Sequence, residues 1–142
     1  MNLSFVIVSF KSFHLVEKII ENIPRENEVI IIENSLDTNL KKKIEKSYHN
    51  VQVVVPKKNL GYGGGLNLGI NKSKNKNVMC MVADISFKKE CILEILNILD
   101  IFSDFSILTP GYPDEGIYKN YPLNKSKKIK SIRIFNNSLK EV

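Results

Sequence analysis

The sequence predicts an α/β protein with a mostly parallel sheet flanked by helices on both faces. Two observations support this class. Short apolar, β-branched runs alternate with segments whose apolar residues recur at helical spacing, which is typical of parallel strands joined by crossover helices. A stretch that holds five of the seven glycines, Asn59–Gly69, follows the third apolar run and opens a helix, as loops do in such sheets.

The first half of the chain provides two strands and two helices of this pattern. The run Leu3–Ser9 is apolar at almost every position, as expected of a strand buried on both faces. A helix follows, with apolar residues at helical spacing from Phe13 until Pro24 ends it. Glu28–Ile32 is a second buried strand. Leu40, Ile44 and Tyr48 then form a narrow apolar stripe on a lysine-coated surface helix.

The second half continues the alternation and then weakens. The remaining predicted elements are a strand Val51–Val55, a helix from the glycine stretch to about Lys74, a strand Asn77–Ala83, a helix Lys88–Phe102 and a strand Phe105–Thr109. The helix ending at Phe102 is apolar around most of its circumference, so we expect it to pack on the sheet. Beyond Pro110, the residues Ile129, Ile132 and Ile134 predict one more short strand.

Length and composition predict one domain over residues 1–142. No apolar run approaches the ~20 residues that span a bilayer, and the first strand carries no basic leader with a cleavage site. Cys80 and Cys91 match no metal or redox spacing, and we expect them to be buried thiols in a reducing compartment. These features predict a cytoplasmic location.

The net charge of +6 comes from clusters of lysine. The clusters are Lys41–Lys43, Lys57–Lys58, Lys72–Lys76 and Lys125–Lys130. Solvated surface faces are the ordinary explanation, but the clusters also suit an anionic small ligand or peripheral contact with an anionic membrane, such as the inner membrane face. Arginine is scarce and no basic-aromatic alternation occurs, so no nucleic-acid partner is expected.

The glycine stretch matches neither common phosphate-binding fingerprint. In a G-x-G-x-x-G pattern the third glycine would fall on Leu66 or Leu68. In a Walker pattern, Ile70 and Asn71 stand where Lys and Ser or Thr are needed. A tight turn that opens a helix remains, and its glycines serve either close packing of helix and sheet or close approach to a ligand.

Chemically useful side chains follow the ends of several predicted strands. Ser9 and Phe10 follow the first strand, Glu33 and Asn34 the second, and Asp84 the fourth. Ligands of parallel sheets bind at this carboxyl edge, so we expect these groups and the glycine stretch to meet there. Asp84 could hold a divalent cation or cap the next helix, and Glu33 could accept hydrogen bonds from a ligand or stand in a turn.

Taken in order, four segments resemble the amino-terminal half of a family-2 glycosyltransferase with the GT-A fold, especially its rhamnosyltransferase-like branch. The segments are Phe5–Ser12, Val29–Asp37, Asn59–Ile70 and Val82–Asp84. The resemblance covers roughly residues 3 to 110, and the Asn-Leu-Gly-Tyr-Gly-Gly-Gly motif is its most specific part.

The resemblance implies an enzyme that binds a nucleotide-diphosphate sugar and transfers the sugar, with inversion, to a glycan or lipid-linked acceptor in polysaccharide biosynthesis. Ser9 and Phe10 would border the base, Glu33 would contact the nucleoside, and Asp84 would hold Mg²⁺ or Mn²⁺. The implied substrate-binding residues are Ser9, Phe10, Glu33, Asn34, Asn59, Gly63, Gly64, Gly65 and Asn67.

The sequence departs from the family at three places. Lys11 replaces the usual Asn, and Val82 replaces the first acid or amide of the metal motif. No residue matches the general base, so the catalytic residue is unknown, and we expect the acceptor-binding part to come from elsewhere, such as a partner chain or a second copy.

Two alternatives remain open. One is a binding or regulatory module that keeps the nucleotide cleft without catalysis. The other is a nucleotidyltransferase, which would need a glycine-rich loop after the first strand, whereas Ser9–Phe13 contains no glycine.

Overall fold

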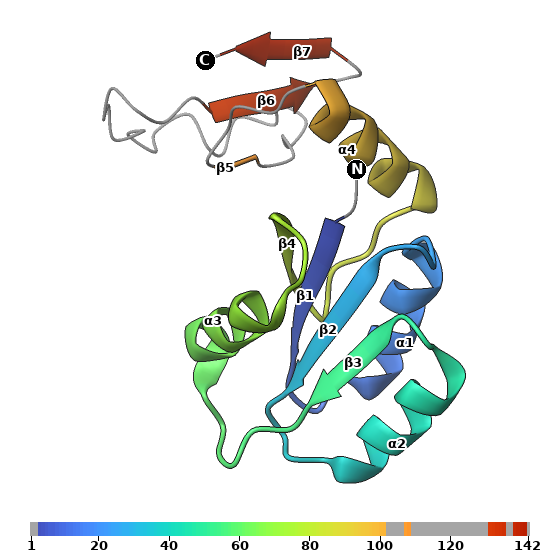
Figure 1. The fold of residues 1–142 in the computed structure, drawn as a ribbon, viewed down its shortest axis with the longest axis vertical. Coiled ribbons are helices and arrows are strands. Elements are labelled where there is room, and N and C mark those ends of the chain that lie inside the picture. The colour runs from blue at the N-terminus through green and yellow to red at the C-terminus, as the bar shows by residue number, and fades with distance from the viewer. Residues whose placement is uncertain (1–2, 102–106, 109–130, 136–137, 142) are drawn as a thin grey trace. The chain divides into compact units, whose positions relative to one another are not determined.

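The computed structural model describes residues 3–101, 107–108, 131–135 and 138–141 (Figure 1). The chain divides into two compact units, Met1–Asp100 and Ile101–Val142. The single domain expected for residues 1–142 stays a prediction.

A four-stranded parallel sheet forms the centre of the first unit. Its strands are β1 (Leu3–Ser9), β2 (Glu28–Glu33), β3 (Val51–Val54) and β4 (Asn77–Val82), in the spatial order β3-β2-β1-β4. All seven residues of β1 are buried, as are five of the six in β2. The near-continuous apolar runs therefore have the expected cause, since both faces of the central strands are covered.

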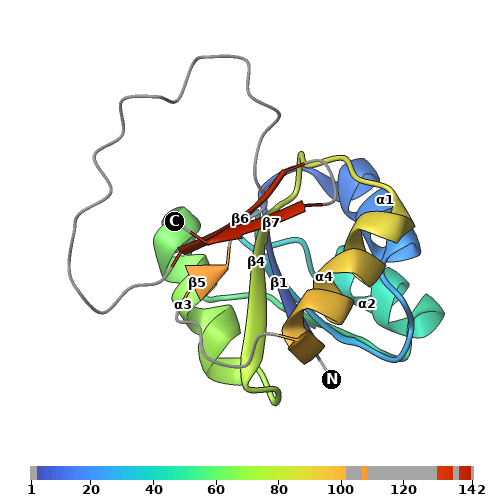
Figure 2. The same ribbon diagram turned by 90° about the horizontal axis from the view of Figure 1, so that it is seen from above.

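The helices lie on both faces of this sheet (Figures 1 and 2). They are α1 (Phe13–Asn22), α2 (Thr38–Ser47), α3 (Gly61–Lys72) and α4 (Lys89–Ile101). Helix α3 covers one face, where Val6, Val8, Ile30 and Ile32 form an apolar cluster with Leu66 and Leu68. Helices α1 and α2 cover the other face (Figure 1). The predicted α/β class, with helices on both sides of a parallel sheet, is confirmed.

Helix α4 is less covered than the sequence suggests. It buries Ile92, Ile98 and Leu99, but Leu93 and Ile101 are exposed among the described residues.

The expectation of buried cysteines is wrong, because Cys80 and Cys91 are both exposed. Cys80 lies in β4, one of the two outer strands of this sheet. Successive side chains of a strand point to opposite faces, and Cys80 and Val82 on one face are exposed, whereas Met81 on the other face is buried.

The second unit holds a small sheet in the order β5-β6-β7. Strand β5 (Ile107–Leu108) pairs in parallel with β6 (Ser131–Phe135), and β6 pairs antiparallel with β7 (Ser138–Glu141). The strands predicted near Phe105–Thr109 and around Ile132 are present, although Phe105, Thr109 and Ile129 lie outside the described residues. Strand β7 was not predicted.

Among the described residues, no helix combines the length and apolar character that crossing a bilayer requires.

Candidate functional site

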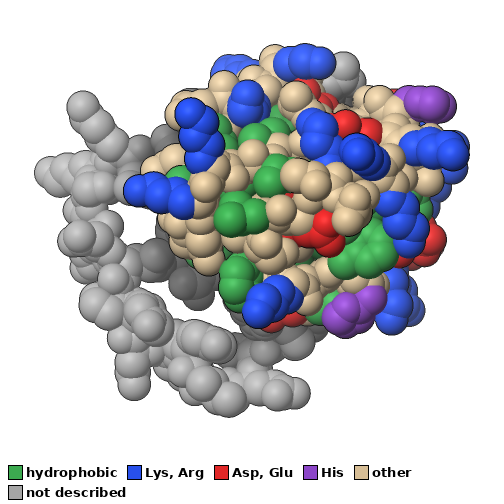
Figure 3. Space-filling view, turned by 90° about the horizontal axis from the view of Figure 1, so that it is seen from below, with side chains coloured by type: hydrophobic (Ala, Val, Ile, Leu, Met, Phe, Trp, Pro, Cys, Tyr) green, Lys and Arg blue, Asp and Glu red, His purple; other side chains and the backbone are tan. Residues whose placement is uncertain are grey.

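The ends of three strands meet at the carboxyl edge of the sheet. Strand register pairs Ser9 with Glu33 across β1 and β2, and Val8 with Val82 across β1 and β4. Figure 3 looks onto this edge, where hydrophobic and acidic side chains are exposed and lysines stand mostly around the margin. The geometry expected from the strand order is therefore present, with the polar residues that follow β1, β2 and β4 on one side of the molecule.

The end of β1 carries a hydroxyl group without a partner. Ser9 is fully buried, and its Oγ is the single buried side-chain oxygen or nitrogen in the described structure that has no hydrogen bond. Buried polar atoms are normally paired, so this atom marks a place where an added group would be stabilised. Phe10, the next residue, is 51% exposed. A buried donor and an exposed ring thus stand side by side.

The carboxylate of Glu33 lies almost completely inside the protein, 1% exposed, at the end of β2. Its Oε1 accepts hydrogen bonds from the Ser35 backbone N–H at 2.7 Å and from the Ser35 hydroxyl. Its Oε2 makes no hydrogen bond within the described residues. The sequence left open whether Glu33 stands in a turn or faces a ligand, and the geometry allows both, since one oxygen fixes the turn and the other remains available.

Two residues beside this edge have unusual backbone conformations. Among the described residues, Lys11 and Leu36 are the non-glycine residues with positive φ, at 54° and 66°. Each follows the end of a strand, β1 or β2, and the Lys11 N–H donates to Ser35 Oγ at 3.3 Å. Strained backbone is enriched where loops are shaped for function, so both turns are candidates for ligand contact.

Asn34 connects the end of β2 to the glycine stretch. Its Nδ2 donates to the Gly61 carbonyl at 3.0 Å, and its Oδ1 accepts from the Leu60 N–H at 3.3 Å. Its own backbone N–H donates to the Ser9 carbonyl at 2.8 Å. Within the stretch, Asn59 Oδ1 accepts from the Gly61 N–H at 2.8 Å. The start of α3 is therefore fixed to the sheet by an amide side chain.

The glycines of α3 fall into two groups. Gly65 and Gly69 are buried against the sheet, where a Cβ would lie 3.0 Å from the Val8 methyl carbons and 2.2 Å from Val6 Cγ1. Gly63 and Gly64 are exposed, as is Asn67. Both interpretations of the stretch thus apply, but to different residues. Close packing of helix and sheet explains Gly65, whereas the exposed backbone of Gly63 and Gly64 is accessible to a ligand.

Asp84 follows β4 by two residues and is exposed. The helix-capping alternative is wrong, because α4 begins at Lys89 and a capping residue must directly precede the first turn. The pKa of the Tyr62 hydroxyl is raised above its ordinary value of 10.0 by partial burial, then by the nearby Cys80 thiol and Asp84 carboxylate. Tyr62, in the first turn of α3, therefore lies close enough to Cys80 and Asp84 for these groups to raise its pKa.

Asp84 is the residue expected to hold a metal ion. No group of three His, Cys, Asp or Glu side chains in the described part of the chain could hold an ion. Mg²⁺ bound to a nucleotide usually takes one or two carboxylates and completes its shell with phosphate oxygens and water. A single Asp84 carboxylate fits the smallest such set. It would serve a cation that arrives with a diphosphate rather than a cation bound by protein alone.

A parallel α/β sheet with helices on both faces and functional groups at its carboxyl edge defines a doubly wound protein of the kind that binds nucleotides there. Residues 4–141 match the model of glycosyl transferase family 2, so the chain belongs to that family. This confirms the family that the glycine motif and the strand-end residues indicated. The rhamnosyltransferase-like branch stays a prediction.

Individual relatives agree with this placement. The chain is 28% identical over 130 residues to the low-salt glycan biosynthesis hexosyltransferase Agl10 of Haloferax volcanii, covering 88% of this chain and 40% of that protein. Two crystal structures of S. aureus TarS also resemble the chain. The structure of residues 1–349 has a TM-score of 0.64 and 19% identity, and the match covers 80% of this chain and 38% of that one. The second has a TM-score of 0.65 and 18% identity, and the match covers 80% of this chain and 23% of that one. The chain thus spans less than half of these relatives, and the structures support the GT-A fold.

Sequence reasoning placed three further residues in the segments of the site but gave them no individual role. Ser35 holds Glu33, Tyr62 stands beside Asp84, and Leu36 has a strained backbone. Position within the Glu-Asn-Ser-Leu-Asp turn was a signal for Ser35, whose side chain commonly bonds to neighbouring backbone. No sequence signal marks a leucine for positive φ.

Proposed function

We propose that this chain is the donor-binding part of a glycosyltransferase that holds a nucleotide-diphosphate sugar at the carboxyl edge of β1, β2 and β4. The observation that carries the proposal is the pair formed by Ser9 and Glu33. Within the described residues, a buried hydroxyl without a hydrogen-bond partner and a buried carboxylate with one oxygen that makes no hydrogen bond occupy paired positions on neighbouring strands. Both could hydrogen-bond a nucleoside, and family membership supports that use.

The remaining groups suit the other parts of such a donor. The ring of Phe10 would border the base, and the exposed backbone of Gly63 and Gly64, with Asn59 and Asn67, would lie along the nucleotide. Asp84 would hold Mg²⁺ or Mn²⁺, which would neutralise the diphosphate as it leaves the sugar. Gly65 contributes by letting α3 approach Val8.

Sugar transfer also requires a group that accepts the proton of the acceptor hydroxyl. None of the residues described at this edge is assigned that role. We propose an inverting transfer to a glycan or lipid-linked acceptor, with the base and the acceptor-binding surface supplied by a further part of the enzyme, a partner chain or a second copy. A donor-binding module without catalysis is the alternative.

Donor binding is tested by calorimetry and thermal shift with UDP-glucose, GDP-mannose, CDP-glucose and dTDP-rhamnose, each with Mg²⁺, Mn²⁺ or EDTA. We expect one nucleotide class to bind. Glu33→Gln should weaken it roughly 10- to 100-fold, the equivalent of about 1.5 to 3 kcal/mol for a hydrogen bond to a charged group. Glu21→Gln is the matched control, since Glu21 is an exposed glutamate on α1. Binding by none of the four donors would overturn the proposal.

The metal role and the catalytic role need separate measurements. Asp84→Asn should remove the part of the thermal shift that EDTA also removes, and an unchanged metal-dependent shift contradicts the role of Asp84. Release of free nucleotide from the bound donor distinguishes transfer or hydrolysis from simple binding. Binding without release favours the module.

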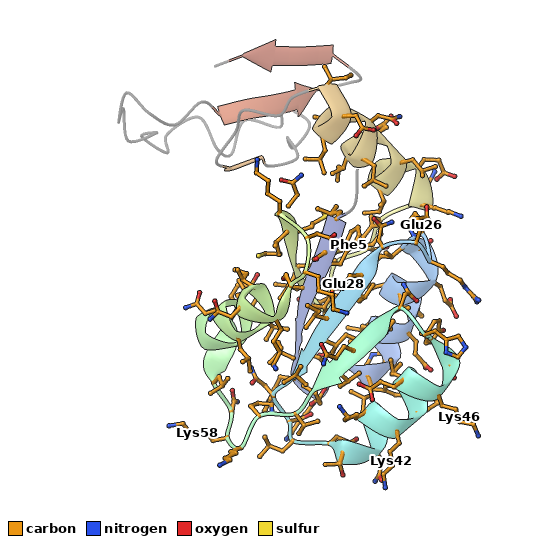
Figure 4. All side chains as sticks on the ribbon, viewed as in Figure 1. Phe5, Glu26, Glu28, Lys42, Lys46 and Lys58 are labelled. Atoms are coloured by element: carbon orange, nitrogen blue, oxygen red, sulfur yellow. The ribbon has the colours of Figure 1, made fainter. Side chains whose placement is uncertain are left out.

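We also propose a cytoplasmic location with peripheral contact to an anionic membrane, where a lipid-linked acceptor would lie. Lys42 on α2 and Lys58 after β3 lie toward the carboxyl ends of the strands, away from Glu26 (Figure 4). Phe10, Leu36, Tyr62, Val82 and Ile85 are exposed in segments at this same edge. Vesicles with anionic lipid should bind the protein at low salt and release it at high salt. Binding that salt leaves unchanged counts against the contact.

A further inference from the structure

Asn34 was expected to contact the substrate, but its side chain is used inside the protein. It is 3% exposed, and its amide bonds at both ends to the turn that opens α3, through the Gly61 carbonyl and the Leu60 N–H. Its backbone N–H extends the connection to the Ser9 carbonyl on β1. One residue therefore joins two strand ends and the glycine turn.

Among the described residues, one other side chain bonds to the start of the glycine turn, since Asn59 Oδ1 accepts from the Gly61 N–H within the same segment. Leu60 precedes α3 and provides no side-chain cap, and Gly61 has a positive φ of 67°. A Cβ at Gly61 or Gly63 would meet no atom within 4 Å, so neither residue is held by close packing. At Gly64 a Cβ would meet only Leu60 of the same turn, at 3.1 Å, and contact with the sheet begins at Gly65, where a Cβ would lie 3.0 Å from the Val8 methyl carbons and 3.4 Å from Asn34 Nδ2.

We infer that Asn34 is a positioning residue, which holds the turn at Gly61–Gly64 against the end of β2 in the place where the donor diphosphate lies. The inference rests on the proposed function, and it assigns Asn34 no contact with the donor. Because binding then depends on a pre-set backbone, loss of the connection weakens donor binding even in a correctly folded protein.

The connection requires an amide. At one end Asn34 donates to a carbonyl, and at the other it accepts from an N–H. Aspartate has the same shape, but its carboxylate cannot donate to the Gly61 carbonyl, whereas a protonated aspartic acid can donate and accept at once. Asn34→Asp should therefore bind the donor poorly at neutral pH and better as the pH falls.

The experiment measures donor affinity by calorimetry for wild type, Asn34→Ala, Asn34→Asp and the control Asn39→Asp. Asn39 is exposed in the first turn of α2, so its exchange makes the same charge change away from the turn. The probe is whichever of the four nucleotide sugars binds wild type most tightly. We expect at least a 10-fold loss for both Asn34 variants at pH 7.5 and less than 2-fold for the control.

The pH series compares Asn34→Asp with wild type at each pH from 7.5 to 5. Glu33, Lys11 and Tyr62 are the ionisable side chains on the neighbouring segments of β2, β1 and α3, and they are the same in both proteins. Measuring wild type at each pH therefore reports the pH dependence of binding that does not require an aspartate at position 34. We expect the deficit of the variant to shrink several-fold toward pH 5.

A second readout needs no ligand. Hydrogen exchange of the Leu60 amide, which donates to Asn34 Oδ1, should be at least 10-fold faster in Asn34→Ala than in wild type. A merely structural role would lower the melting temperature and leave the affinity of the folded protein unchanged. Wild-type affinity in both Asn34 variants, or a pH-independent deficit in Asn34→Asp, overturns the inference alone. Absence of binding by wild type overturns the proposed function and the inference with it.

Discussion

The close approach of α3 to the sheet at Gly69 predicts a large cost for adding one methyl group. A Cβ at this position would lie 2.2 Å from Cγ1 of Val6, a residue with no exposed surface. Carbon atoms in contact prefer about 3.5 to 4.0 Å, so helix or strand must shift by roughly 1.5 Å. Overpacking of this kind costs about 1 to 3 kcal/mol, and the better helix propensity of alanine returns up to about 1 kcal/mol.

We therefore expect Gly69→Ala to lower the free energy of unfolding by about 1 to 2 kcal/mol. Urea denaturation followed by circular dichroism measures the change. Gly63→Ala is the matched control in the same helix, because a Cβ there meets no atom within 4 Å, and it should not destabilise the protein. The double variant Val6→Ala/Gly69→Ala removes the clashing methyls, so its loss should fall short of the sum of the single losses by about 1 kcal/mol. Equal stability of the two glycine variants, or additive losses, would refute the packing argument.

Three further predictions concern the turns around the site. Asp37→Ala should cost about 1 kcal/mol of unfolding free energy in urea, because Asp37 Oδ1 caps α2 through the N–H groups of Asn39 and Leu40, whereas Asp37→Asn should cost little. Lys11→Asn should gain about 0.5 kcal/mol in the same assay, since asparagine tolerates the positive φ found there; a loss would show that φ is not the limiting feature. Ultraviolet titration against a Tyr62→Phe reference should place the Tyr62 pKa above 10.0, and Asp84→Asn should lower it. Since the folded state then keeps this proton longer than the unfolded state, stability should fall as pH rises above 10.0, and Tyr62→Phe should lessen the fall.

The parallel core could be predicted because its strands carry their own signal. Leu3–Ser9 and Glu28–Glu33 are apolar without alternation, and burial on both faces is the ordinary cause of that pattern. Strand β7 was missed because Ser138–Glu141 is short and mostly polar. Phe135 pairs with Ser138, so two residues join β6 to β7, and Asn136 and Asn137 are turn-forming types that could have signalled a hairpin.

The error at the cysteines has a different origin. Hydrophobic periodicity identifies a strand but not its position in the sheet, and the apolar run from Val78 to Ala83 looks like the central strands. In the structure β4 stands at one end of the order and is covered unequally on its two faces, since Met81 is buried whereas Cys80 and Val82 are exposed. The order of strands depends on contacts between segments far apart in the chain, which a single sequence does not display.

The same limit explains which parts of the site were foreseen. The residues that end strands could be named from sequence, because the carboxyl edge is the place where parallel sheets bind ligands. The role of each residue could not be predicted from sequence, since it depends on strand register and on the direction of the side chain. Asn34 and Glu33 were both expected to contact a ligand, yet the structure directs the Asn34 amide to the glycine turn and leaves one oxygen of Glu33 available.

The glycine stretch shows how one motif can serve packing and access together. Gly65 and Gly69 are four residues apart, so they occupy the same face of α3, and that face lies on Val6 and Val8. Gly63 and Gly64 lie at other angles around the helix and are exposed beside the edge of the sheet. A helix that must approach a sheet closely and also present bare backbone at its start needs glycine at both sets of positions. This requirement explains why the stretch fits neither nucleotide-binding fingerprint, since its spacing combines a helical repeat with a turn.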